Sequence, residues 1–257
     1  MSRPLKVLPL ALATAVVAAL SILAASCNTS GSTEVRLING LSNNGNPYVS
    51  LDVYVNGAKL NSTALGYASV YPAKATPAAY AGVPPGSDAV EAFDTGTTTP
   101  AILNSVTETF TGGGEYTLVL SGSVNNLDHP PTAFLFKDNN TLPTTGNVEF
   151  RVINGSVASQ QYSGGIDVYI LPQGTQPNGN PQIPGLAYGS DATGYMTMTY
   201  LNGTEYTFWV TPHSSTTPIA SQSFGPVNQQ ITTLVLTDNQ YGSAVASPPF
   251  IYLDDMN

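Results

Sequence analysis

Two short stretches of the chain, residues 49–55 and 166–170, alternate between aliphatic side chains and polar or aromatic ones. A period of two predicts β-strands that place the aliphatic residues on a buried face and the intervening residues on the opposite face. The intervening positions are Asp52 and Tyr54 in the first stretch and Asp167 and Tyr169 in the second.

Other apolar, β-branched runs lie between turn-forming pairs such as Asn56-Gly57 and Asn202-Gly203. We expect seven or eight short strands in each half of the chain, at the spacing of an immunoglobulin-like (Greek-key) sandwich. The strand-like runs are residues 116–120 and 134–136 in the first half and 206–210, 233–236 and 250–252 in the second.

The two halves are copies of one another. Residues 35–40 read Val-Arg-Leu-Ile-Asn-Gly, and residues 150–155 read Phe-Arg-Val-Ile-Asn-Gly. Asp52 and Asp167 lie 115 positions apart, which is the size of one small β domain. The sequence therefore predicts an all-β protein with two tandem sandwiches after an N-terminal signal segment. The predicted parts are a signal peptide at 1–26, a tether at 27–33, sandwiches at 34–138 and 148–257, and a linker at 139–147.

The internal match continues through the middle of each copy. Leu65-Gly66-Tyr67-Ala68-Ser69 corresponds to Leu186-Ala187-Tyr188-Gly189-Ser190. The wider spacing of this second motif indicates an insertion of about six residues in the second copy. The stretch from Pro172 to Pro184, rich in Pro, Gly, Asn and Gln, is the predicted site of that insertion and a long surface loop.

The N-terminus carries a signal for export. Arg3 and Lys6 precede an apolar run from Val7 to Leu23, and small residues then lead to Cys27, the only cysteine. This pattern resembles a bacterial lipoprotein signal with its lipobox, which predicts a lipid on Cys27. An ordinary secretory signal and an uncleaved membrane anchor are the alternatives.

The net charge of the chain limits the kinds of partner that it can bind. After cleavage before Cys27 the chain would hold five basic residues and 16 acidic ones, and this balance repels nucleic acid. Because the chain has only one cysteine, it cannot form an internal disulfide, and each sandwich must be stabilised by its own hydrophobic core. The membrane, reached through the lipid, is the predicted partner, beside an unidentified glycan or protein.

The order of these motifs resembles the domain-of-unknown-function family 4397. The shared features are the opening Val-Arg strand that ends in Asn, the Asp-Val-Tyr-Val strand with its Asn-Gly turn, and the Leu-x-Tyr-x-Ser segment. The resemblance implies tandem β-sandwich repeats in secreted, wall-attached or lipid-anchored proteins, and it brings no known catalytic residue. The matching positions are Arg36, Asp52, Tyr54, Asn56 and Gly57 in the first copy and Arg151, Asp167 and Tyr169 in the second; Leu171-Pro172 replaces the Asn-Gly turn there.

Motifs for catalysis, phosphate binding or metal binding are not found in the sequence. We therefore predict no catalytic residue, no metal and no cofactor. His129 and His213 both lie beside prolines, in predicted loops. A catalytic group of His213 with Ser214 or Ser215 is the weaker interpretation, and a solvated loop histidine is the stronger one.

Asp52 and Asp167 are candidates for a site because both copies retain them. In one interpretation each carboxylate, beside Tyr54 or Tyr169, binds a cation or the hydroxyl groups of a sugar. In the other, favoured interpretation each pairs across the sheet with Arg36 or Arg151, or accepts hydrogen bonds from a neighbouring loop.

Trp209 is the only tryptophan, and alternation places it on the face opposite Tyr206, Phe208 and Val210. An exposed aromatic side chain there could stack on a sugar ring or a partner protein. The alternative, which we favour, is that Trp209 packs under a loop or against the other sandwich.

These observations predict a non-catalytic lipoprotein of the bacterial cell envelope that acts as a binding or structural module. Asn28, which follows the lipidated cysteine, favours the outer membrane or the cell surface. A carbohydrate-binding or adhesion module is the main alternative, and a hydrolase is the second.

Overall fold

A computed structural model of the protein describes residues 31–42, 50–73, 79–124, 127–191 and 194–238, and the backbone of 250–256. All of its strands lie in one compact unit, Ser32–Asn257. The predicted signal peptide and Cys27 lie outside the described residues. Among the described residues, no helix has the length and apolar character needed to cross a membrane.

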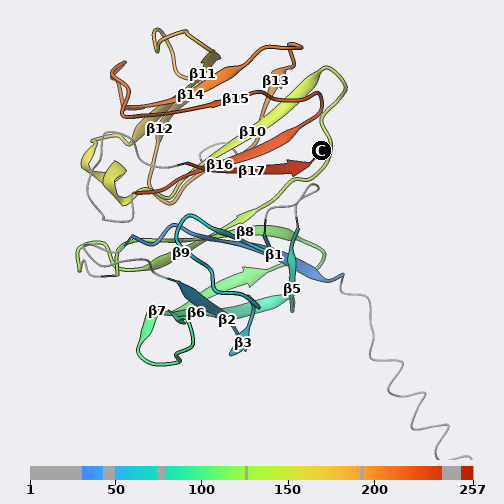
Figure 1. The fold of residues 1–257 in the computed structure, drawn as a ribbon, viewed down its shortest axis with the longest axis vertical. Coiled ribbons are helices and arrows are strands. Elements are labelled where there is room, and N and C mark those ends of the chain that lie inside the picture. The colour runs from blue at the N-terminus through green and yellow to red at the C-terminus, as the bar shows by residue number, and fades with distance from the viewer. Residues whose placement is uncertain are drawn as a thin grey trace, which may run out of the picture. The chain divides into compact units, whose positions relative to one another are not determined.

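The fold is all-β, as predicted, and its two copies have nearly the same strand order (Figure 1). The first copy, which we call the first repeat, contains β1 (Thr33–Asn39), β2 (Leu51–Val55), β3 (Ala58–Lys59), β4 (Val70–Tyr71), β5 (Ala81–Val83), β6 (Gly86–Asp94), β7 (Ala101–Phe110), β8 (Glu115–Ser121) and β9 (Thr132–Lys137). The second repeat contains β10 (Asn147–Asn154), a short 3-10 helix η1 (Val157–Gln161), β11 (Ile166–Pro172), β12 (Ile183–Leu186), β13 (Met196–Thr199), β14 (Tyr206–Pro212), β15 (Ala220–Phe224), β16 (Ile231–Leu236) and β17 (Phe250–Met256).

Each repeat is a sandwich of two sheets. In the first repeat β4, β1, β8 and β9 form one sheet, with β5 also paired to β1, and β3, β2, β6 and β7 form the other. In the second repeat the corresponding sheets are β13-β10-β16-β17 and β12-β11-β14-β15. The sheet that carries the opening strand β1 or β10 is called the inner sheet below, and the sheet that carries β2 or β11 is called the outer sheet.

The apolar faces predicted from alternation form the cores. Leu51, Val53 and Val55 of β2 are buried between the two sheets of the first repeat, and Ile166, Val168 and Ile170 of β11 are buried in the second. The two cores are separate clusters, because each is closed by the facing sheets of its own repeat. This arrangement explains why the aliphatic positions recur in both copies.

The inner sheets contain one parallel pair each. β1 pairs in parallel with β8, and β10 pairs in parallel with β16. In β8 every residue from Tyr116 to Ser121 is buried, and in β16 every residue from Ile231 to Leu236 is buried. A strand buried on both faces needs a packing partner on each side. Here the outer sheet of the same repeat packs on one face, and the other repeat packs on the opposite face.

The contact between repeats has an apolar centre. Ile38 and Val119 of the first repeat pack with Ile153 and Val235 of the second, and all four are completely buried. The inner sheets therefore meet each other, while the outer sheets lie at the two ends of the unit (Figure 1).

Candidate functional site

Asp52 lies on the face of β2 opposite the core, as predicted, but it is only 2% exposed. Lys59 on the neighbouring strand β3 places its Nζ atom 2.8 Å from Oδ1, and the backbone N–H of Gly96 donates to Oδ2 at 3.0 Å. Burial raises the pKa of this carboxyl group, but the bonds from Gly96 and Lys59 outweigh it and the pKa is lowered overall. Asp52 is therefore an ionised residue that joins a strand to a loop.

Asp167 has the same role in the second repeat, where it is also 2% exposed. Its oxygens accept the backbone N–H groups of Gly185 at 2.7 Å and Ser214 at 2.8 Å, and one lies 2.8 Å from Nδ1 of His213. Burial raises the pKa of Asp167, and the bonds from His213, Gly185 and Ser214 lower it by more. The carboxylate thus holds the edge strand β12 on one side and the β14–β15 loop on the other.

The loop partners of the two acids are equivalent. Gly96 and Ser214 each stand two residues before a Thr-Thr-Pro sequence, and both have positive φ, 80° and 62°. Left-handed backbone is costly for serine, and the bond to Asp167 contributes to holding it. Retention of an aspartate in both repeats is explained by this shared turn.

The cross-sheet pairing of these acids with Arg36 and Arg151 is a wrong prediction. The ion-pair partners are Lys59 for Asp52 and His213 for Asp167. The arginines lie on the inner sheets, on strands that face the other repeat, so they are on the wrong sheet to reach the acids.

His213 is more than a solvated loop histidine, because its ring is hydrogen-bonded to buried Asp167 while its side chain stays 39% exposed. Such a pair corresponds to the acid and the histidine of a Ser-His-Asp hydrolase triad, which also needs a serine nucleophile. Ser214, however, supplies its backbone N–H to the acid, and the hydroxyl of Ser215 accepts the N–H of Thr217 at 3.1 Å. Within the part of the chain that the structure describes, no group of three His, Cys, Asp or Glu side chains could hold a metal ion.

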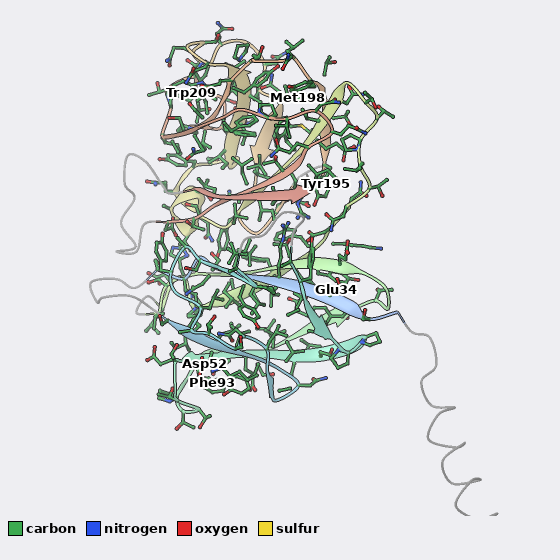
Figure 2. The ribbon with its side chains drawn as sticks, turned by 45° about the vertical axis from the view of Figure 1, so that its right-hand side comes forward. Glu34, Asp52, Phe93, Tyr195, Met198 and Trp209 are labelled. Carbon is green, nitrogen blue, oxygen red and sulfur yellow. The ribbon has the colours of Figure 1, made fainter. Side chains whose placement is uncertain are left out.

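The aromatic candidates differ between repeats. Tyr54 is half-buried and meets Phe93 edge-on, with ring centroids 5.4 Å apart. Tyr169 is only 2% exposed, and its hydroxyl donates to the carbonyl of Gly179, in the predicted long loop, at 3.4 Å. Trp209 is half-buried and lies across from Tyr169 in the strand register, so it stands beside the side chain that this loop covers. Figure 2 shows Asp52 and Phe93 at one end of the unit and Trp209 at the other.

Sequence reasoning missed a buried polar cluster between the repeats. Asp138 lies between two arginines: Arg151 Nη2 is 2.5 Å from Oδ1, and Arg36 Nε is 3.5 Å from Oδ2. All three side chains are at most 2% exposed. The hydroxyl groups of Thr117 and Tyr80 also donate to Asp138, both at 2.8 Å. The sequence pattern places Asp138 beside the predicted linker, and the structure shows that it lies at the centre of the interface.

The arginine contacts are reciprocal. Arg36 donates through Nε to Thr117 of its own repeat and through Nη2 to Thr233 of the other, at 2.7 and 3.5 Å. Arg151 donates through Nε to Thr233 of its own repeat and through Nη2 to Thr117 of the other, both at 3.3 Å. The guanidinium groups also lie over the rings of Tyr80 and Tyr195. Reciprocal contacts are the property of a self-complementary, two-fold interface.

The second duplicated motif belongs to the same interface. Tyr67 donates its hydroxyl to the backbone carbonyl of Asp238 in the second repeat. Tyr188, its counterpart, lies 3.0 Å from the hydroxyl of Ser121 and packs edge-on against Phe134, both in the first repeat. Burial raises the pKa of Tyr67 to about 12 and also raises that of Tyr188.

The glycine that ends the opening motif permits the close approach. A Cβ atom on Gly40 would lie 2.8 Å from a methyl group of Thr237 in the other repeat and 3.0 Å from the carbonyl of Leu120. On Gly155 it would lie 3.3 Å from Val119 of the other repeat. The Arg, the Ile and the Gly of the duplicated motif are therefore interface residues, and the uninterrupted apolar and threonine runs at 116–120 and 233–236 are the sequence signal for the interface.

Comparisons with known proteins identify the family of the chain but no relative of known function. The model of a domain of unknown function, DUF4397, matches residues 33–169, from β1 to β11. No curated protein matches the chain. Among solved structures the chain is similar to a leucine-rich repeat protein from Bacteroides thetaiotaomicron, at 14% identity and a TM-score of 0.21. The match covers 79% of this chain and 25% of that one, so the chain spans about a quarter of the other protein's length.

Proposed function

The chain belongs to the DUF4397 family, whose model matches more than half of it, and on that premise we propose that it is a non-catalytic, lipid-anchored module of a bacterial cell envelope. Its two sandwiches would act as one rigid binding or structural unit beyond the membrane. The proposed anchor is Cys27, and Asn28 after it favours the outer membrane or the cell surface.

The observation that carries this proposal is what the duplicated polar residues do. Arg36 and Arg151 join the two repeats, and Asp52 and Asp167 hold loops. Polar residues kept in both copies are thus occupied in building one unit, which supports a module that presents a surface rather than one that performs a reaction. The outer sheets, which are exposed in parts of β7 and β15, remain for contact with a partner.

The anchor is tested in the full-length protein expressed in a bacterial host. We expect the membrane fraction to yield an N-terminal peptide that begins at Cys27 and carries a diacylglycerol. Cys27→Ala should abolish both the lipid and the membrane association, whereas Ser26→Ala, which keeps a small residue before the cysteine, should leave both in place. A mature N-terminus without lipid contradicts the proposal.

A hydrolase is the second candidate, because Asp167 and His213 form an acid–histidine pair. Our proposal predicts that the wild-type chain does not hydrolyse ester or glycoside substrates through His213. Any background hydrolysis should therefore be the same in the His213→Ala variant. Turnover that disappears in this variant, in a protein that still unfolds cooperatively, would replace our proposal with the hydrolase.

A further inference from the structure

The second repeat covers its own outer sheet with a segment of its own chain. The loop from Gln173 to Gln182 contains two prolines and two glycines and has no charged residue. The side chain of Gln182 accepts the backbone N–H of Ile170 at 2.8 Å, and Tyr169 donates its hydroxyl to the carbonyl of Gly179. An uncharged loop that contains proline and glycine therefore lies against Tyr169, which is only 2% exposed.

The first repeat has the corresponding face without that loop, and Glu91 lies across from Tyr54 where Trp209 lies across from Tyr169. Between β2 and β3 the chain makes only the two-residue turn Asn56-Gly57, and both residues of β3 are exposed. Tyr54, the counterpart of Tyr169, is half-buried, and among the described residues its hydroxyl makes no hydrogen bond. Its ring and that of Phe93 stand at 90° to each other.

These groups match the needs of an extended peptide. Aromatic rings at an angle offer flat apolar surfaces on which proline rings pack, and a tyrosine hydroxyl can donate to a peptide carbonyl, as Tyr169 does. Lys59 pairs with Asp52 at 2.8 Å, and Glu91, across from Tyr54 in the strand register, adds a carboxylate to the same face. An uncharged peptide meets no repulsion there.

We propose that the outer sheet of the first repeat, at Tyr54 and Phe93, is a docking surface for an extended, uncharged, proline- and glycine-rich segment of a partner protein. The second repeat carries the equivalent of this ligand in its own loop. The inference rests on the proposed role as a binding module and names the partner of that module. It does not depend on the lipid, so failure of the anchor test and failure of docking are distinguished.

The probe is a synthetic peptide with the sequence of residues 172–184, titrated into the purified full chain by calorimetry and by chemical-shift changes. We expect saturable, weak binding, with a Kd on the order of 0.1–1 mM for a single short segment. Tyr54→Phe, which removes only the hydroxyl, should weaken binding about fivefold, the value of one hydrogen bond. The double variant Tyr54→Ser with Phe93→Ser should weaken it at least tenfold.

The controls separate docking from general stickiness. Leu127→Ser changes an apolar side chain that is 98% exposed elsewhere on the first repeat, and it should leave the Kd unchanged. A peptide with both internal prolines replaced by alanine should bind more weakly. Failure of the peptide to bind at millimolar concentration, or binding that the double variant retains, overturns the proposal. So does an oligosaccharide that binds at Tyr54 and Phe93 where the peptide does not.

Discussion

Asp138→Asn tests whether the polar cluster between the repeats holds them together. Asp138 is fully buried between Arg36 and Arg151, and the hydroxyl groups of Thr117 and Tyr80 donate to it. Removing one partner of a buried ion pair costs about 3–5 kcal/mol, because the remaining charges keep their desolvation penalty. For a folded unit of this size each kcal/mol lowers Tm by about 2–4 °C, so we expect a fall of about 6–20 °C.

The assay is urea unfolding followed by two probes. Far-UV circular dichroism reports both repeats, and the fluorescence of Trp209 reports the second. In the wild-type chain both probes should give one coincident transition, since the repeats share a buried interface. In Asp138→Asn the midpoint should fall, and the two probes should separate if the repeats then unfold one after the other.

Two matched variants decide the interpretation. Asp94→Asn removes an exposed acid and should change stability by less than about 0.5 kcal/mol. Replacing Arg36 and Arg151 by Met together with Asp138 by Leu removes all three charges, and apolar replacements of this kind are often neutral or stabilising. A loss below about 1 kcal/mol in Asp138→Asn would refute the reasoning, as would an equal loss in the uncharged triple variant.

Three further variants test the loop-holding acids, the buried tyrosine and the close approach of the repeats. Both aspartates have folded pKa values below the ordinary 3.8, so their contribution to stability is present above about pH 4 and is lost as the pH falls. The double variant Asp52→Asn with Asp167→Asn should therefore lose less stability on acidification than the wild type, as measured by thermal melts from about pH 2 to 7. In the wild type, ionisation of Tyr67 should lower the stability from above pH 10 until the pH reaches its folded pKa of about 12. Tyr67→Phe should remove this loss in thermal melts from about pH 8 to 12. Gly40→Ala should cost about 1–3 kcal/mol in urea unfolding by overpacking the interface, whereas Gly82→Ala, where a Cβ meets nothing within 4 Å, should cost far less.

The strands and cores were predictable because alternation is a local signal. Residues 49–55 and 166–170 needed only their own pattern to place aliphatic side chains in the core, and β2 and β11 follow it. The burial of Asp52 and Asp167 was not predictable in the same way. A residue opposite the core is covered or exposed according to which loop crosses it, and such contacts depend on residues 18–47 positions away, such as Gly96, Gly185 and Ser214.

The interface left a trace in the sequence that alternation reasoning overlooks. Residues 116–120 and 233–236 are apolar or threonine without interruption, which is typical of strands buried on both faces. The partners could not be found from either copy alone. Asp138 stands outside the duplicated motif, and its role follows only when Arg36 and Arg151 are brought to it from two different strands.

The reciprocal contacts explain why duplication preserved the opening motif so closely. In a two-fold interface each position serves twice: Arg36 reaches Thr233 as Arg151 reaches Thr117, and Ile38 packs in the same cluster as Ile153. A change in one copy therefore leaves its counterpart facing an altered partner, so both copies are constrained together. The outer sheets carry no such constraint. The second repeat carries a loop over Tyr169 that the first repeat lacks, and this difference leaves the pairing of the inner sheets undisturbed.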